Sequence, residues 1–165
     1  LGFTGVEELS VWRKLIVMAP VSLSIALLVS SCEDKVTQCQ RLIQVVNAGN
    51  SLIEQNKGEQ VVTSLQLSKD LQVITKSLEE LNFSDPNLQE FQSSFASIFE
   101  NLSQAIAKAS LALGVAKSAE ASPTGREKLQ KARTEIDTSL TAAETAAKKS
   151  DTLAEDLNKY CGQSQ

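Results

Sequence analysis

The sequence of 165 residues contains no histidine, and aromatic residues make up only 4% of it. Without histidine the protein lacks the side chain that most often acts as a general base near neutral pH and as a metal ligand. The sequence also contains no glycine-rich phosphate loop, no Gly-x-Ser-x-Gly elbow and no internal repeat. These absences predict a noncatalytic protein that uses no cofactor and no metal.

Because large aromatic anchors are few, the core must be built mainly from leucine, isoleucine, valine and alanine, which suits packing of helix against helix. Apolar residues recur at spacings of three and four along most of the chain after residue 32. The pattern is interrupted near four sites, which are Gly49, Gly58, Ser84–Pro86 and Ser122–Gly125. We expect an all-α fold, an antiparallel up-down-up-down four-helix bundle with coiled-coil-like packing, whose third and fourth helices are longer than the first two. The expected ranges are 35–57, 59–82, 86–120 and 123 onward.

The N-terminal segment has the order of a bacterial export signal. Arg13 and Lys14 precede an apolar run over 15–29, which is shorter than the ~20 residues that span a bilayer. The run ends in Val-Ser-Ser-Cys at 29–32 and here resembles the lipobox of bacterial lipoproteins. This resemblance, which covers only residues 13–32, implies cleavage between Ser31 and Cys32 and attachment of acyl chains such as palmitate at Cys32. It divides the chain into a signal peptide, 1–31, and a helical domain, 32–165.

An ordinary secretory signal and an uncut membrane anchor remain alternatives. The chain opens with Leu1, and Glu7 and Glu8 fall in a region that should be positively charged. We therefore expect residues 1–10 to precede the true start, with Val11 as the initiator. The expected location is the bacterial cell membrane or outer membrane, with the domain facing the periplasm or the exterior, or the thylakoid lumen if the host is a cyanobacterium.

Cys39 and Cys161 remain once Cys32 carries a lipid. In an exported protein such a pair predicts a disulfide, and the alternative is two free thiols. The start of the first helix and the end of the fourth lie at the same end of an up-down bundle. Counting residues along the helices, however, places Cys161 about six residues, or ~9 Å, away from Cys39.

Positive charge gathers between Lys108 and Arg133, where six Lys and Arg residues oppose two Glu residues. In the rest of 32–165 eight cations oppose sixteen anions. The bundle is thus expected to be acidic near its anchor and basic at its far end. This end is a candidate partner-binding tip for an acidic protein or an anionic envelope component, and the alternative is an ordinary solvated surface. The candidate residues are Lys117, Arg126, Lys128, Lys131 and Arg133. Nucleic acid is not expected as a partner, because no aromatic residues are interleaved with the basic ones.

These features favour a membrane-anchored accessory or scaffold lipoprotein that is not an enzyme. The alternative function is binding of a small apolar ligand between the helices, around Phe91, Phe95 and Phe99.

Overall fold

The computed structural model describes residues 33–56 and 61–162. The chain divides into two units between Ser31 and Cys32, and the helices considered below belong to the second unit. The expected signal peptide, its cleavage position and the lipidated Cys32 lie outside the described residues. Within the described ranges no helix combines the length and apolar character needed to cross a membrane.

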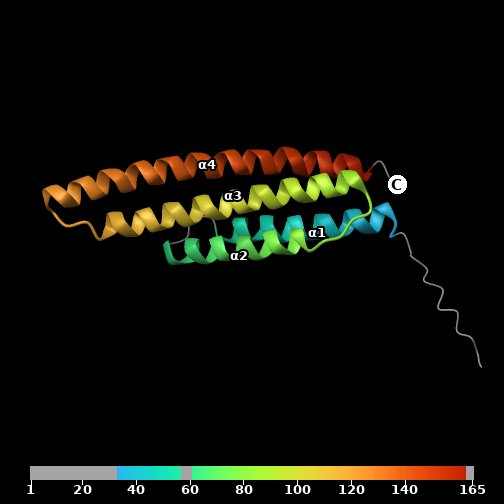
Figure 1. Cartoon of the computed structure of the whole chain (residues 1–165), viewed down its shortest axis with the longest axis horizontal. Coiled ribbons are helices and arrows are strands. Elements are labelled where there is room, and N and C mark those ends of the chain that lie inside the picture. Colours follow the sequence, from blue (N-terminus) through green and yellow to red (C-terminus); the bar gives the residue numbers. More distant parts are fainter. Residues whose placement is uncertain (1–32, 57–60, 163–165) are drawn as a thin grey trace, which may run out of the picture. The chain divides into compact units, whose positions relative to one another are not determined.

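The described ranges form four helices and no strand, as the sequence predicts: α1 (Lys35–Gln55), α2 (Val61–Glu79), α3 (Pro86–Lys117) and α4 (Pro123–Gly162). Consecutive helices run in opposite directions (Figure 1). The expectation of a longer second hairpin is confirmed, since α3 and α4 have 32 and 40 residues against 21 and 19 in α1 and α2. At 1.5 Å per residue α3 is about 48 Å long.

The core lies where all four helices pack together. Its fully buried large side chains are Leu42, Leu71, Leu78, Leu88, Phe95, Phe99 and Leu157. The aromatic pair Phe95 and Phe99 comes from α3, which packs extensively against both α2 and α4. Burial of leucine and phenylalanine side chains contributes roughly 1.5–3 kcal/mol each, so this cluster is the main source of stability.

Local signals set three of the helix starts. The Asp34 carboxylate accepts a hydrogen bond from the backbone N–H of Thr37, and Asp85 accepts from the N–H groups of Asn87 and Leu88. Pro86 follows Asp85 at the first helical position, where a missing N–H costs nothing. The Ser122 hydroxyl accepts from the N–H of Gly125 at the start of α4. Each cap satisfies donors that the first helical turn leaves without partners.

The second helix ends at Glu79, three residues earlier than the sequence pattern indicates. The chain then crosses to α3 through residues 80–85 and buries Phe83 on the way. The Gln92 side chain donates to the carbonyls of Leu78 and Leu81, and Gln89 donates to that of Phe83. These bonds satisfy carbonyls that have no partner N–H within α2 after it ends at Glu79.

The α3–α4 hairpin continues beyond α2. Ser68 on α2 and Ser103 on α3 lie level, since their hydroxyl oxygens are 3.1 Å apart. The start of α2 at Val61 is seven residues, or about 10 Å, further along, level with residue 110 of α3. Leu129 and Leu140 belong to the apolar pattern at spacings of three and four, yet they are 48% and 57% exposed. The pattern does not bury them, because the helices cover less of α4 than an even bundle would.

Candidate functional site

The candidate tip residues all lie at the turn between α3 and α4. Lys117 is the last residue of α3, while Arg126, Lys128, Lys131 and Arg133 occupy the first three turns of α4. All five side chains are exposed. Lys131 forms an ion pair with Glu127 at 2.9 Å, but exposed pairs of this kind contribute well under about 1 kcal/mol. The structure therefore gathers the positive charge at the end of the molecule remote from residue 33.

The turn that presents these residues is closely built. Ser118 ends α3, and its backbone N–H donates to the carbonyl of Gly114. Gly125 is buried against the preceding turn, where a Cβ at this position would overlap the carbonyl oxygen of Glu120. Only glycine fits this close approach, so Gly125 sets the direction in which α4 leaves the turn.

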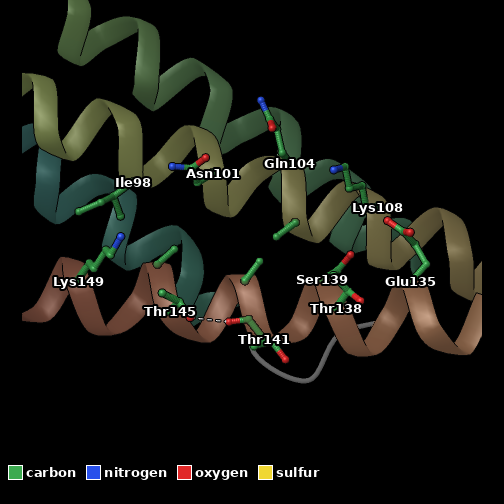
Figure 2. A pocket seen from close by; sticks show the side chains of 13 residues that line it. Ile98, Asn101, Gln104, Lys108, Glu135, Thr138, Ser139, Thr141, Thr145 and Lys149 are labelled. Carbon is green, nitrogen blue, oxygen red and sulfur yellow. Dashed lines mark hydrogen bonds between the residues drawn. The ribbon is translucent and has the colours of Figure 1, made fainter.

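A long groove, here called the outer groove, follows the seam between α3 and α4. Its first section has a volume of about 640 Å³ and extends from Ile98 and Lys149 to Lys108 and Glu135 (Figure 2). Its second section, of about 440 Å³, is lined by residues from Lys108 to Val115 and from Lys128 to Glu135. Lys108 and Glu135 line both sections, so the two are continuous. Every lining residue belongs to α3 or α4.

The outer groove opens away from α2. Ser103 faces α2 through its hydrogen bond to the carbonyl of Ser68. Asn101 and Ala105 line the groove and are two residues before and after Ser103. Because a step of two residues turns about 200° around the helix axis, both lie on the side of α3 opposite Ser103. The sequence shows the basic residues of this region but not the groove, because the groove depends on how α3 and α4 lie against each other.

The opposite end of the bundle is closed by the disulfide that the sequence predicts between Cys39 and Cys161. Their Cα atoms are 5.9 Å apart, and Cys161 lies within α4, so the expected offset of six residues is wrong. The Gln38 side chain accepts from the N–H of Asp85, and Tyr160 donates to the Asp85 carboxylate. These contacts hold the start of α1 and the end of α4 at the same level.

Around this disulfide lies a polar and aromatic cluster that sequence reasoning did not find. The Tyr160 hydroxyl donates to Asp85 at 2.7 Å, and the Lys35 ammonium lies 3.6 Å from the Tyr160 ring centroid. Desolvation acts to raise the pKa of Asp85, but the hydrogen bonds from Tyr160, Leu88 and Asn87 and the Lys35 charge together lower that pKa below its ordinary value. Tyr160 was the only tyrosine in the chain, and that isolation was the one signal available.

The phenylalanines proposed to hold an apolar ligand are packed against protein. Phe95 and Phe99 are fully buried, and a Cβ added at Gly49 would lie 2.6 Å from the Phe99 ring. Phe91 contacts Tyr160, with ring centroids 5.8 Å apart. Phe91 is only half-buried and lines a hollow of about 450 Å³ together with Leu153 and Tyr160. The ligand alternative stays a prediction.

In the part of the chain that the structure describes, no group of three or more acidic or cysteine side chains is arranged to hold a metal ion. No protein-family model matches the chain, and comparisons with curated proteins and with solved structures find no significant similarity. The described residues define a disulfide-closed, all-helical protein with a basic, grooved end.

Proposed function

We propose that this protein is a noncatalytic accessory lipoprotein of the bacterial envelope, anchored through Cys32, that docks a partner through the basic end of the α3–α4 hairpin. The observation that carries the proposal is the separation of the two ends. Glu33, next to Cys32, pairs with Arg41 near the disulfide, whereas Lys117 and Arg126 lie at the far end of α3 and α4.

The separation gives each end a distinct role. Cys32 directly precedes Glu33, so a lipid there would be attached to the end of the bundle at which the disulfide joins α1 and α4 covalently. The two or more acyl chains implied by the lipobox resemblance are enough for persistent anchoring. The hairpin would then carry the basic residues up to about 48 Å, the length of α3, from the anchored end.

The charge distribution supports docking of an acidic partner. Six cations against two anions between Lys108 and Arg133 create a local positive field in a chain whose net charge is −4. Such a field attracts an acidic surface and repels the equally basic tip of another copy. Because screening acts over about 8 Å at physiological salt, the attraction is local to the tip.

Acyl labelling tests the anchor. The full chain is expressed in its host with a labelled fatty acid, alongside Cys32→Ala and the control Ser31→Ala, which keeps a small residue before the cysteine. We expect label and membrane attachment in the wild type and control and neither in Cys32→Ala. Membrane attachment of Cys32→Ala, or a wild type without label, would show that the anchor is not a lipid.

Charge reversal tests the tip. Membrane complexes are purified with the wild type and with a variant carrying Glu at Arg126, Lys128, Lys131 and Arg133. Lys69→Glu/Lys76→Glu, a reversal at exposed positions of α2, is the control. We expect the tip variant alone to lose its partner. Retention of every partner by the tip variant would contradict the docking proposal.

A further inference from the structure

The outer groove is lined by charges of predominantly one sign. Four lysines border it, and Glu135 is its only acidic lining residue in the two described sections. The lysines are Lys108, Lys128, Lys131 and Lys149. Arg126 and Arg133 belong to the same basic end but do not line the groove. The groove therefore has its own positive rim, distinct from the general charge of the tip.

The groove also presents apolar surface to water. Leu111 and Val115 line its second section and are 61% and 46% exposed. The small residues Ala112 of α3 and Ala132 of α4 line the same section. An anionic polymer would use the lysines and leave the leucine and valine in contact with water. A ligand with both carboxylates and apolar side chains would use the whole surface.

The dimensions of the groove match a helix. The two sections extend along α3 from Ile98 to Val115, a separation of 17 positions that corresponds to about 26 Å, or nearly five helical turns. The seam stays hollowed beyond Ile98, towards Asp156. The floor includes Ala105 and Ala146. Their small side chains let a helix from another protein approach α3 and α4 to about the usual 8–10 Å between helix axes. A straight seam between two antiparallel helices suits another helix laid along it.

We infer that the outer groove binds an acidic amphipathic helix of a partner protein. Apolar side chains along one face of that helix contact Leu111, Ala112 and Val115, and its flanking carboxylates pair with Lys128 and Lys131. The inference rests on the proposed docking function and names the chemistry of its partner. It separates a helical protein ligand from an anionic polymer, which the tip charge alone would also attract.

Peptide binding to the full lipidated chain in detergent tests the inference. The probe is a fluorescent peptide of about 20 residues, with leucines at spacings of three and four and glutamates beside them. One comparison peptide has the same composition in scrambled order, a second replaces glutamate with lysine, and polyglutamate represents a simple polyanion. Fluorescence anisotropy measures each affinity. We expect the ordered acidic peptide to bind about tenfold or more tightly than every comparison ligand.

Matched variants locate the binding site. Lys128→Glu/Lys131→Glu reverses two charges at the groove, and Lys69→Glu/Lys76→Glu reverses two at exposed positions of α2. Leu111→Gln removes an exposed leucine in the groove, whereas Leu140→Gln changes one of similar exposure, 57% against 61%, that does not line it. We expect each groove variant to weaken binding about tenfold and each control to change it less than about twofold.

Three results would overturn the inference. They are equal binding of the scrambled peptide or polyglutamate, equal losses in the Lys128→Glu/Lys131→Glu and Lys69→Glu/Lys76→Glu variants, and no measurable binding of the acidic peptide. The charge-reversal variant of the tip, at Arg126, Lys128, Lys131 and Arg133, separates the two proposals. If it still loses its cellular partner in any of these cases, the docking function stands and only the inference of an acidic helical partner is wrong. Circular dichroism of each variant confirms that the helices are intact.

Discussion

At Gly49 the backbone of α1 lies directly against α3 and α2. A Cβ at this position would be 2.6 Å from Cζ of Phe99 and 3.1 Å from a methyl carbon of Ile74. Phe99 is fully buried and has little room to turn. Gly49→Ala should therefore lower the free energy of unfolding, because overpacking costs about 1–3 kcal/mol and outweighs the ~1 kcal/mol that alanine gains over glycine in a helix. Urea unfolding measures the difference.

Gly114 supplies the matched control for this substitution. It also lies inside a helix, but a Cβ there would meet no atom within 4 Å. Gly114→Ala should raise the free energy of unfolding by about 0.5–1 kcal/mol, since only the helix propensity changes. An equal gain in both variants would show that Phe99 does not crowd position 49.

The Asp85 carboxylate should make stability fall in acid. Desolvation acts to raise the pKa of this group, but hydrogen bonds from Tyr160, Leu88 and Asn87 lower that pKa below its ordinary value in the folded state. A carboxyl group whose folded pKa is below the unfolded value of 3.8 contributes stability above that pH, and the contribution is lost as the pH falls through the folded pKa. Asp85→Asn, which can still cap α3, should therefore lose less stability than the wild type as the pH falls below 3.8.

Tyr160→Phe tests the same network from its other side. The variant removes the hydroxyl that donates to Asp85 at 2.7 Å but keeps the ring beneath Lys35. Its stability should depend on acid less steeply than that of the wild type and more steeply than that of Asp85→Asn. Parallel pH profiles for all three proteins would rule out a contribution from this carboxylate.

At the scale of helices, the starts were more predictable than the ends. Asp85-Pro86 and Ser122-Pro123 are local signals, because the capping side chain bonds to amides two or three residues away. The end of α2 depends instead on two contacts. The Gln92 side chain donates to the carbonyl of Leu81, 11 residues earlier, and Phe83 is buried in the core. No periodic pattern within 61–79 encodes those contacts, so the sequence placed this end three residues too late.

The turn between α3 and α4 should loosen when its glycine is replaced. Gly125→Ala places a Cβ where the Glu120 carbonyl oxygen lies, and backbone atoms cannot move aside as a side-chain end can. Hydrogen exchange measured by mass spectrometry should become faster in 118–128 while α1 and the middle of α2 keep their protection. Thr124→Ala, at the exposed neighbouring position, is the control. Unchanged exchange in Gly125→Ala would mean that the turn tolerates a side chain there.

At the scale of the molecule, the sequence predicted which end is basic but not the surface that the basic residues border. Lys108, Lys128 and Lys131 are up to 23 residues apart in sequence, and the groove forms only when α3 and α4 adopt one particular register. The same dependence on register explains why Cys161 was expected about six residues out of place. An error of that size along a helix moves a side chain by ~9 Å and turns it to a different face.

The disulfide joins Cys39 and Cys161, which are 122 positions apart in the sequence. It should stabilise the whole bundle, because the chain between its cysteines includes all of α2 and α3 and most of α1 and α4. In the chain-entropy model a closure of this length restricts the unfolded chain, and native disulfides typically contribute about 2–4 kcal/mol. Cys39→Ala/Cys161→Ala should lower the free energy of unfolding by that amount in urea. Reductant should lower the stability of the wild type and leave the variant unchanged. Since the outer groove lies towards the other end of α3 and α4, peptide binding should persist in the folded variant; its loss would show that the disulfide controls the groove as well as the bundle.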